Sequence, residues 1–177
     1  MKTRTIPADS TYNVVTYDIL IDGKPVDPGY QVLSITIVKE ANRIPSARVI
    51  FRDGQAAEET FPISEKENFI PGKSITIKIG RDRQNAQLFK GIIAKHGIRL
   101  RESGASELVL DCRDECVKMT LGRKNRYFED SKDSEAIEQL IAGYGGLKPD
   151  VEATRLKHKE LIQFHCTDWD FMLSRAE

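Results

Sequence analysis

Residues 71–113 constrain the fold most, because they predict three consecutive antiparallel strands separated only by short turns. In residues 74–79, isoleucines alternate with polar side chains, which is the period of a strand with one face in water. Residues 87–101 carry apolar side chains on both faces around Gly91, which predicts a strand buried on both sides with a bulge or bend at the glycine. Residues 107–113 alternate again. A bent meander of this kind favours closure into a barrel.

Three further strands are predicted upstream, at residues 14–21, 31–39 and 47–52, where every second side chain is apolar. Residues 55–72 contain four large apolar side chains and are predicted to form an ordered loop, with residues 60–63 as a candidate short strand. Because no helix interrupts these strands, we expect an antiparallel sheet that curls into a barrel and hides its hydrophobic edges.

The pattern changes near residue 115, and helices enter the sequence. The predicted elements are a short helix at 115–121, a basic loop or extended segment at 122–128, an amphipathic helix capped by Asp133 or Ser134 that ends near 143, a strand at 161–166, and a helix that begins at Thr167 with a capping box to Asp170. We therefore divide the chain into a polar tail (1–13), a β-barrel (14–114) and the start of a helical and mixed region (115–177). The fold class is mainly β, with a helical insertion.

The charge balance argues against a polyanionic partner. The chain has 27 Lys and Arg against 27 Asp and Glu, so it has no net field to attract nucleic acid or an anionic membrane. No apolar run is long enough for a membrane span, and the N-terminus lacks the apolar segment of a secretory signal. A protein partner and cytoplasmic assembly are expected.

No residue pattern predicts catalysis, a metal or a cofactor. The three histidines, His96, His158 and His165, have no carboxylate or cysteine at metal-binding spacing. Residues 165–168 contain His, Cys, Thr and Asp, but neighbours on a strand point to opposite faces and cannot form a triad. The three cysteines form no even framework, and we interpret them as reduced structural thiols. The sequence therefore indicates a protein that is not an enzyme.

One basic and aromatic cluster leaves two interpretations open. Arg123, Lys124 and Arg126 precede Tyr127 and Phe128, a combination typical of platforms for single-stranded nucleic acid on small barrels. Acidic residues follow at once and offset the charge, which favours a protein-contact loop. A stand-alone β-barrel module that binds nucleic acid or glycan is the alternative function.

Five motifs together resemble one known family. They are EANRIPSARVIFRDG from residue 40, FIPGKSITIKIG from 69, LFKGIIAKHGIRL from 88, KMTLGRKNRYF from 118 and TDWDFMLSRAE from 167. In this order they resemble the N-terminal part of VgrG-like spike (hub) proteins of contractile injection systems, which comprise type VI secretion systems and extracellular phage-tail-like particles. The resemblance covers residue 14 to the last residue.

The resemblance implies a fold and a set of partners. The fold would be that of phage baseplate hubs, with two related barrels per chain and three chains in a ring. The partners would be two further copies of the chain, an Hcp-like inner-tube protein, baseplate proteins, and a PAAR-type tip protein and effectors bound through parts beyond this sequence. Neither nucleic acid nor cofactor is implied, and a target membrane would be met only during injection, when the particle is exported.

The same resemblance implies residues for structural anchoring or protein contact. They are Glu40, Asn42, Arg43, Ile44 and Pro45 in the first motif, and Trp169, Asp170 and Phe171 in the last motif. The basic cluster itself, and not the resemblance, adds Arg123, Lys124 and Arg126 as candidate protein-contact residues. We expect Trp169 to fill a core or interchain pocket. An ordinary turn and ordinary core packing within one chain explain the same residues equally well.

Overall fold

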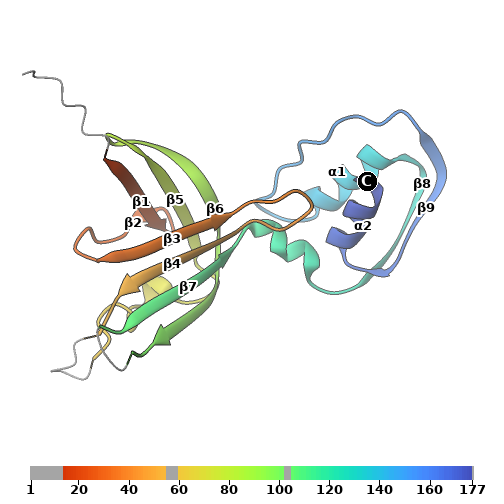
Figure 1. Ribbon diagram of the computed structural model, residues 1–177. Helices are drawn as coiled ribbons and strands as arrows, with labels where there is room; N and C mark the ends of the chain where they lie inside the picture. Colours follow the sequence, from red (N-terminus) through yellow and green to blue (C-terminus); the bar gives the residue numbers. More distant parts are fainter. Residues whose placement is uncertain (1–13, 55–59, 102–104, 177) are drawn as a thin grey trace, which may run out of the picture. The chain divides into compact units, whose positions relative to one another are not determined.

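The computed structural model describes residues 14–54, 60–101 and 105–176, which form two compact units (Figure 1). The first unit contains the chain up to Ile37 together with Ala47–Cys112. The second unit contains Val38–Ser46 and the chain from Arg113 onward. Each unit has an apolar core of its own. The second unit thus includes Val38–Ser46, a hairpin tip that lies within the sequence of the first unit. The sequence patterns did not predict that this tip belongs to the second unit.

The first unit is one seven-stranded sheet. Its strands are β1 (Val15–Ile21), β2 (Lys24–Pro25), β3 (Val32–Val38), β4 (Ser46–Arg52), β5 (Ser74–Arg81), β6 (Gln84–Arg99) and β7 (Glu107–Arg113), and a 3-10 turn, η1 (Glu67–Phe69), precedes β5. They are hydrogen-bonded in the order β2-β1-β5-β6-β7-β4-β3. The mainly antiparallel β fold class is confirmed, and the six long strands lie where alternation predicted them.

The core follows from that alternation. One face of β4, β5, β6 and β7 contributes side chains with at most 2% of their surface exposed: Val49, Phe51, Ile75, Ile77, Phe89, Ile93, Leu108, Leu110 and Cys112. Burying a large aliphatic or aromatic side chain stabilises the folded state by about 1.5–3 kcal/mol relative to leaving it in water. The sheet is therefore held mainly by this inner face.

The register corrects two expectations about β6. Ile77 pairs with Phe89 and Lys78 pairs with Gln87, so the bulge lies at Leu88 rather than at Gly91, which pairs normally with Ile75. The bulge leaves Leu88 without a partner on β5 and 42% exposed. The prediction that the middle of β6 is buried on both faces was therefore wrong, because only one face of this strand meets the core.

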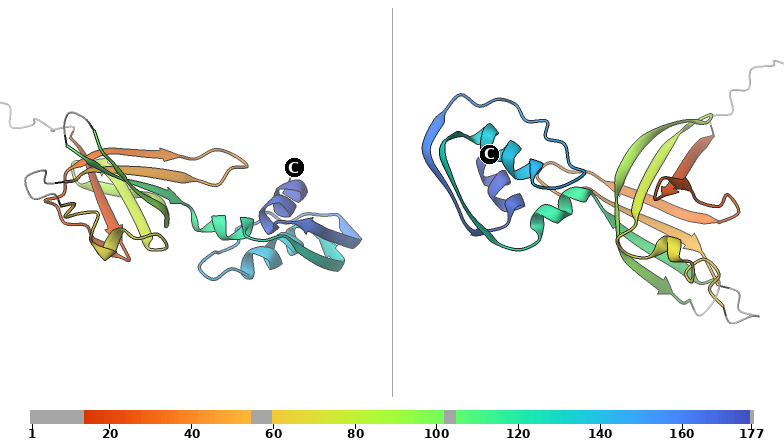
Figure 2. Two further views of the ribbon diagram at one scale, coloured as in Figure 1. Left: turned by 90° about the horizontal axis from the view of Figure 1, so that it is seen from below. Right: turned by 180° about the vertical axis from the view of Figure 1, so that it is seen from behind.

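The sheet curls strongly, but its ends do not join into a closed barrel among the described residues. Figure 1 shows β3, β4 and β7 crossing in front of β1, β5 and β6, and the view from behind in Figure 2 shows β5 and β6 nearer the viewer than β3 and β4. The strands β2 and β3 end the hydrogen-bonded order. β2 stops at Pro25, and Pro28 follows, and neither proline has an N–H to extend the ladder. A pocket of about 490 Å³ lies beside this opening, lined by β1, β3 and the segment between β2 and β3.

A buried carboxylate holds residues 63 and 64 of the predicted ordered loop, of which residues 55–59 lie outside the described residues. Asp53 is 3% exposed and accepts hydrogen bonds from the backbone N–H groups of Ile63 (3.0 Å) and Ser64 (2.8 Å), and from the Ser64 hydroxyl. Ile63 and Phe69 of this segment are buried, as expected for an ordered segment. The candidate strand at residues 60–63 is not formed, because Asp53 takes N–H groups that a strand would have used.

The second unit packs two helices against a two-stranded ribbon. Its elements are η2 (Glu115–Thr120), β8 (Lys124–Lys132), α1 (Asp133–Ala142), β9 (Lys157–Cys166) and α2 (Asp168–Ala176). β8 and β9 pair antiparallel, with Phe128 opposite Leu161, and both of these side chains are buried. Phe171 of α2 stacks on Phe128 with ring centroids 5.8 Å apart. The basic segment that the sequence left as a loop or extended segment is thus strand β8.

The helix starts match the sequence in one case and differ in the other. For α2, the predicted N-cap is confirmed, since the Thr167 hydroxyl accepts from the N–H of Asp170. The carboxylate of Asp170 accepts from that same hydroxyl, and not from the backbone N–H as in a full capping box. For α1, the predicted caps were wrong. Asp133 binds Arg175 (2.6 Å) and His158 (2.9 Å) instead, so α1 begins with the N–H of Lys132 donating to Glu135. No helix in the described ranges has the length and apolar character needed to cross a bilayer.

Replacing Asp53 by Asn is expected to destabilise the protein by about 1–3 kcal/mol at neutral pH, because buried N–H groups lose a charged acceptor. Burial raises the pKa of Asp53, but hydrogen bonds from Ser64, Ile63 and Gly54 more than offset it, so the pKa lies below its ordinary value of 3.8. The ionised form therefore stabilises the fold above about pH 4, and this contribution is lost as the pH falls further.

Urea denaturation followed by circular dichroism, at several pH values, tests this. The difference between wild type and Asp53→Asn should narrow below about pH 4. Asp27→Asn is the matched control, since the exposed Asp27 carboxylate accepts a hydrogen bond from the N–H of Gly29 and none from a buried group among the described residues. Equal stability of wild type and Asp53→Asn at neutral pH would contradict the assignment.

Candidate protein-contact site

The EANRIP motif forms the tip of the β3–β4 hairpin. Asn42 adopts a left-handed backbone with φ of 58°, a conformation that Asn tolerates better than most residues. On either side of this turn, Arg43 forms an ion pair with Glu40, with 3.1 Å between guanidinium and carboxylate. Both side chains are largely exposed, so the pair orders the tip but adds little stability.

Pro45 attaches this tip to the rest of the second unit. Its ring forces Ile44 out of helical geometry, and its carbonyl accepts a hydrogen bond of 3.0 Å from the N–H of Asp114. The Asp114 side chain in turn accepts from the N–H of Cys116 and begins η2. The hairpin tip and η2 are thereby held together by backbone groups.

The TDWDF motif contains the most buried charge of the second unit. Asp168 has no exposed surface, and its carboxylate accepts from the Tyr144 hydroxyl (2.6 Å), the Lys124 ammonium (2.8 Å) and the Gln163 amide (2.8 Å), with Arg126 at 3.4 Å. These side chains come from β8, from β9 and from the segment after α1. One carboxylate thus connects β8, β9 and the segment after α1 to the start of α2.

The electrostatics of Asp168 follow from these contacts. Burial raises the pKa of its carboxyl, and the hydrogen bonds from Lys124, Tyr144 and Gln163, with the Arg126 charge, lower it further than burial raises it. The carboxylate therefore stays ionised. The same contact raises the pKa of the Lys124 ammonium, chiefly through its hydrogen bond to Asp168.

The basic cluster does not form one exposed surface. Lys124 and Arg126 turn toward Asp168, and their side chains are 35% and 32% exposed. Arg123 is exposed and stands apart from this network. The structure therefore separates the three basic residues that the sequence grouped together.

A pocket of about 520 Å³ brings two of the predicted motifs together. Its lining comes from the hairpin tip, from the β7–η2 junction and η2, and from the start of α2: Val38, Glu40, Asn42, Arg43, Ile44, Ser46, Arg113, Thr120 and Trp169. We call this the Trp169 pocket. The indole of Trp169 is half-buried, and it also packs against the core of the second unit. The remaining predicted residues lie elsewhere, since Asp170 caps α2 and Phe171 is in the core.

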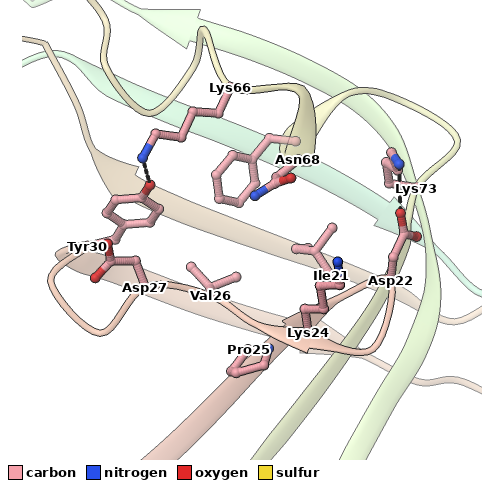
Figure 3. A pocket seen from close by; sticks show the side chains of 11 residues that line it. Ile21, Asp22, Lys24, Pro25, Val26, Asp27, Tyr30, Lys66, Asn68 and Lys73 are labelled. Atoms are coloured by element: carbon pink, nitrogen blue, oxygen red, sulfur yellow. Dashed lines mark hydrogen bonds and ion pairs between the residues drawn. The ribbon is translucent and has the colours of Figure 1, made fainter.

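The first unit has a second pocket of similar volume that no sequence motif indicated. Figure 3 shows Lys66 directed at the Tyr30 hydroxyl at one end and Lys73 directed at Asp22 at the other. The Lys73–Asp22 separation is 2.8 Å. Because two of its lysines already have polar partners, this pocket offers less unpaired charge than its three ammonium groups suggest.

Potential metal ligands and thiols show no reactive arrangement in the part of the chain that the structure describes. No group of three or more His, Cys, Asp or Glu residues is placed to hold a metal ion within that part. Burial raises the pKa of Cys112 and Cys116 to about 12, so both remain thiols at neutral pH.

A comparison with protein-family models shows which family this chain belongs to. The Alg8 N-terminal domain family matches residues 11–177. The chain belongs to the Alg8 N-terminal domain family. A search of curated proteins found no match to this Alg8 N-terminal domain.

Solved structures confirm the fold expected from the resemblance to VgrG-like spike and hub proteins. A 43 kDa tail protein of prophage MuSo2 from Shewanella oneidensis matches 92% of this Alg8 N-terminal domain with a TM-score of 0.66 and 13% identity. A component of the type VI secretion system of Escherichia coli, itself similar to the bacteriophage T4 tail proteins gp27 and gp5, matches 87% with a TM-score of 0.61 and 10% identity.

The Francisella PdpA–VgrG complex contains a third similar chain, with a TM-score of 0.54 and 10% identity over 92% of this domain. This domain spans 48%, 41% and 28% of the three matched chains. At these identities the matches establish the fold alone. The fold is thus that of tail proteins from phages and type VI secretion systems.

Replacing Asp168 by Asn is expected to destabilise the second unit by about 2–4 kcal/mol, because a buried ionic network loses its only carboxylate. Trp169 is the only tryptophan in the chain and is adjacent to Asp168 in sequence. Denaturation followed by its fluorescence therefore measures the stability of the second unit. Asp150→Asn is the control, since Asp150 is an exposed acid of the same unit. Similar midpoints for the two variants would show that Asp168 does not organise the unit.

Proposed function

We propose that this chain is the N-terminal portion of a structural hub protein in a contractile injection apparatus, of the phage-tail-like or type VI secretion kind. The observation that carries the proposal is the shared fold, which extends over both units and 92% of the chain in the prophage tail protein. The hub would couple the inner tube to the membrane-puncturing spike as a homotrimer.

The proposal includes the partners and the route of the protein. It would assemble in the cytoplasm with two further copies of itself, an Hcp-like inner-tube protein and baseplate proteins. A PAAR-type tip protein and effectors would bind through parts of the full protein outside this sequence. The complete particle would then leave the cell and meet a target membrane on firing.

The site chemistry supports a structural role over catalysis. In the second unit, the buried acid Asp168 has no exposed surface, and its carboxylate is held by Lys124, Tyr144 and Gln163. The Trp169 pocket is lined by side chains that recognise proteins, including tryptophan and arginine. We infer that the chain acts through contacts and not through a reaction.

Deletion of the gene in its native host is expected to abolish assembled particles. Electron microscopy of sheathed particles in cell lysates provides the readout, and the intact gene supplied on a plasmid is the control. Particles that still assemble and contract without the gene product would refute the hub function. Binding of the purified chain to single-stranded nucleic acid at low salt would then favour the stand-alone binding module.

A further inference from the structure

The Trp169 pocket has an apolar wall suited to a side chain of another protein. Val38 is 44% exposed, and Ile44 and Trp169 are half-buried, so together they leave apolar surface at the pocket. The volume of about 520 Å³ lies within the range of pockets that hold small ligands or a few residues of a peptide. Tryptophan in such a position is a frequent anchor of protein interfaces.

The charges of the pocket are unbalanced toward the positive. Its ionisable lining consists of one carboxylate, Glu40, and two guanidinium groups, Arg43 and Arg113, which gives −1 + 2 = +1. Glu40 is already paired with Arg43 at 3.1 Å. Arg113 is exposed and forms no ion pair with any residue that the structure describes. The exposed guanidinium of Arg113 is therefore available to pair with a carboxylate of another molecule.

Local contacts hold the pocket in shape before any partner binds. The left-handed Asn42 and the Pro45–Asp114 hydrogen bond fix the hairpin tip. The Thr167 cap and the Asp168 network fix the start of α2, and with it the position of Trp169. A preformed pocket loses little conformational freedom on binding, which favours affinity even for a short segment.

We propose that the Trp169 pocket docks an acidic, partly apolar segment of a partner protein, with a carboxylate on Arg113 and an apolar side chain against Trp169 and Ile44. A nucleic acid fits less well, because a polyanion needs several unpaired cations and the described lining of this pocket supplies one, Arg113. The inference goes beyond the proposed hub function and does not depend on it, since it concerns only contacts within the second unit.

Trp169 provides its own reporter, because the chain has one tryptophan. The probes are the blocked peptides acetyl-Asp-Leu-Asp-Leu-amide and acetyl-Lys-Leu-Lys-Leu-amide, which share their apolar side chains and differ in charge. Binding of the acidic peptide is expected to change the emission of Trp169, and its affinity should be at least about threefold higher than that of the basic peptide. Added salt should weaken the binding of the acidic peptide. No change in emission up to about 10 mM acidic peptide, or equal affinity of both peptides, would overturn the proposal.

Two variants locate the charge contact. Arg113→Gln should weaken acidic-peptide binding by about threefold to fivefold, the range expected for one exposed ion pair. Arg155→Gln is the control, since Arg155 is an exposed arginine of the same unit outside the pocket. The Arg155→Gln variant should bind the acidic peptide with the affinity of wild type. An equal loss in both variants would show that the peptide responds to general charge alone, which would overturn the assignment.

Two further readouts keep the result interpretable. Unchanged circular dichroism and thermal midpoint of Arg113→Gln show that the variant is folded, because Arg113 makes no ion pair in the described structure. An oligothymidylate that displaces the acidic peptide and binds more tightly would replace the proposal with a nucleic-acid site. Failure of peptide binding with intact particle assembly would remove this inference and leave the hub function in place.

Discussion

The second unit depends on one buried carboxylate. Asp168 has no exposed surface, and removing a carboxylate from water is unfavourable unless hydrogen-bond donors surround it. Lys124, Tyr144 and Gln163 supply those donors from separate parts of the chain. Their convergence sets the entry of α2, which places Phe171 on Phe128 in the core and Trp169 at the pocket. The apolar packing and the candidate contact site therefore share one electrostatic constraint.

The strands of the first unit could be predicted because their inner faces repeat every second residue. The alternation of Ile75 and Ile77 with polar neighbours has one simple solution, a strand with a buried face. The bulge at Leu88 could not be predicted in the same way, because a register shift depends on which residues the partner strand offers. The sequence predicted closure into a barrel and not an open edge beside Pro25, because the alternation of side chains does not determine whether the two ends of a curled sheet pair.

The roles of charged residues were less predictable than those of apolar ones. Asp168 and Asp170 looked alike in the sequence, as acids at a helix start, yet one organises the unit and the other caps the helix. Lys124 and Arg126 looked like part of an exposed basic surface, and their partner lies some forty residues later in the chain. Such pairings arise from tertiary packing, which sequence spacing does not encode. The meeting of Glu40 and Arg43 with Trp169 at one pocket is of the same kind.

The central claim for this chain is the proposed hub function, in which it lies between the inner tube and the spike. Cryo-electron microscopy of intact particles from the native host tests that claim most directly. The account predicts density for both units of this chain in a ring of three copies, between the end of the inner tube and the spike. Particles in which that position is occupied by a different protein, and this chain is absent, would contradict it.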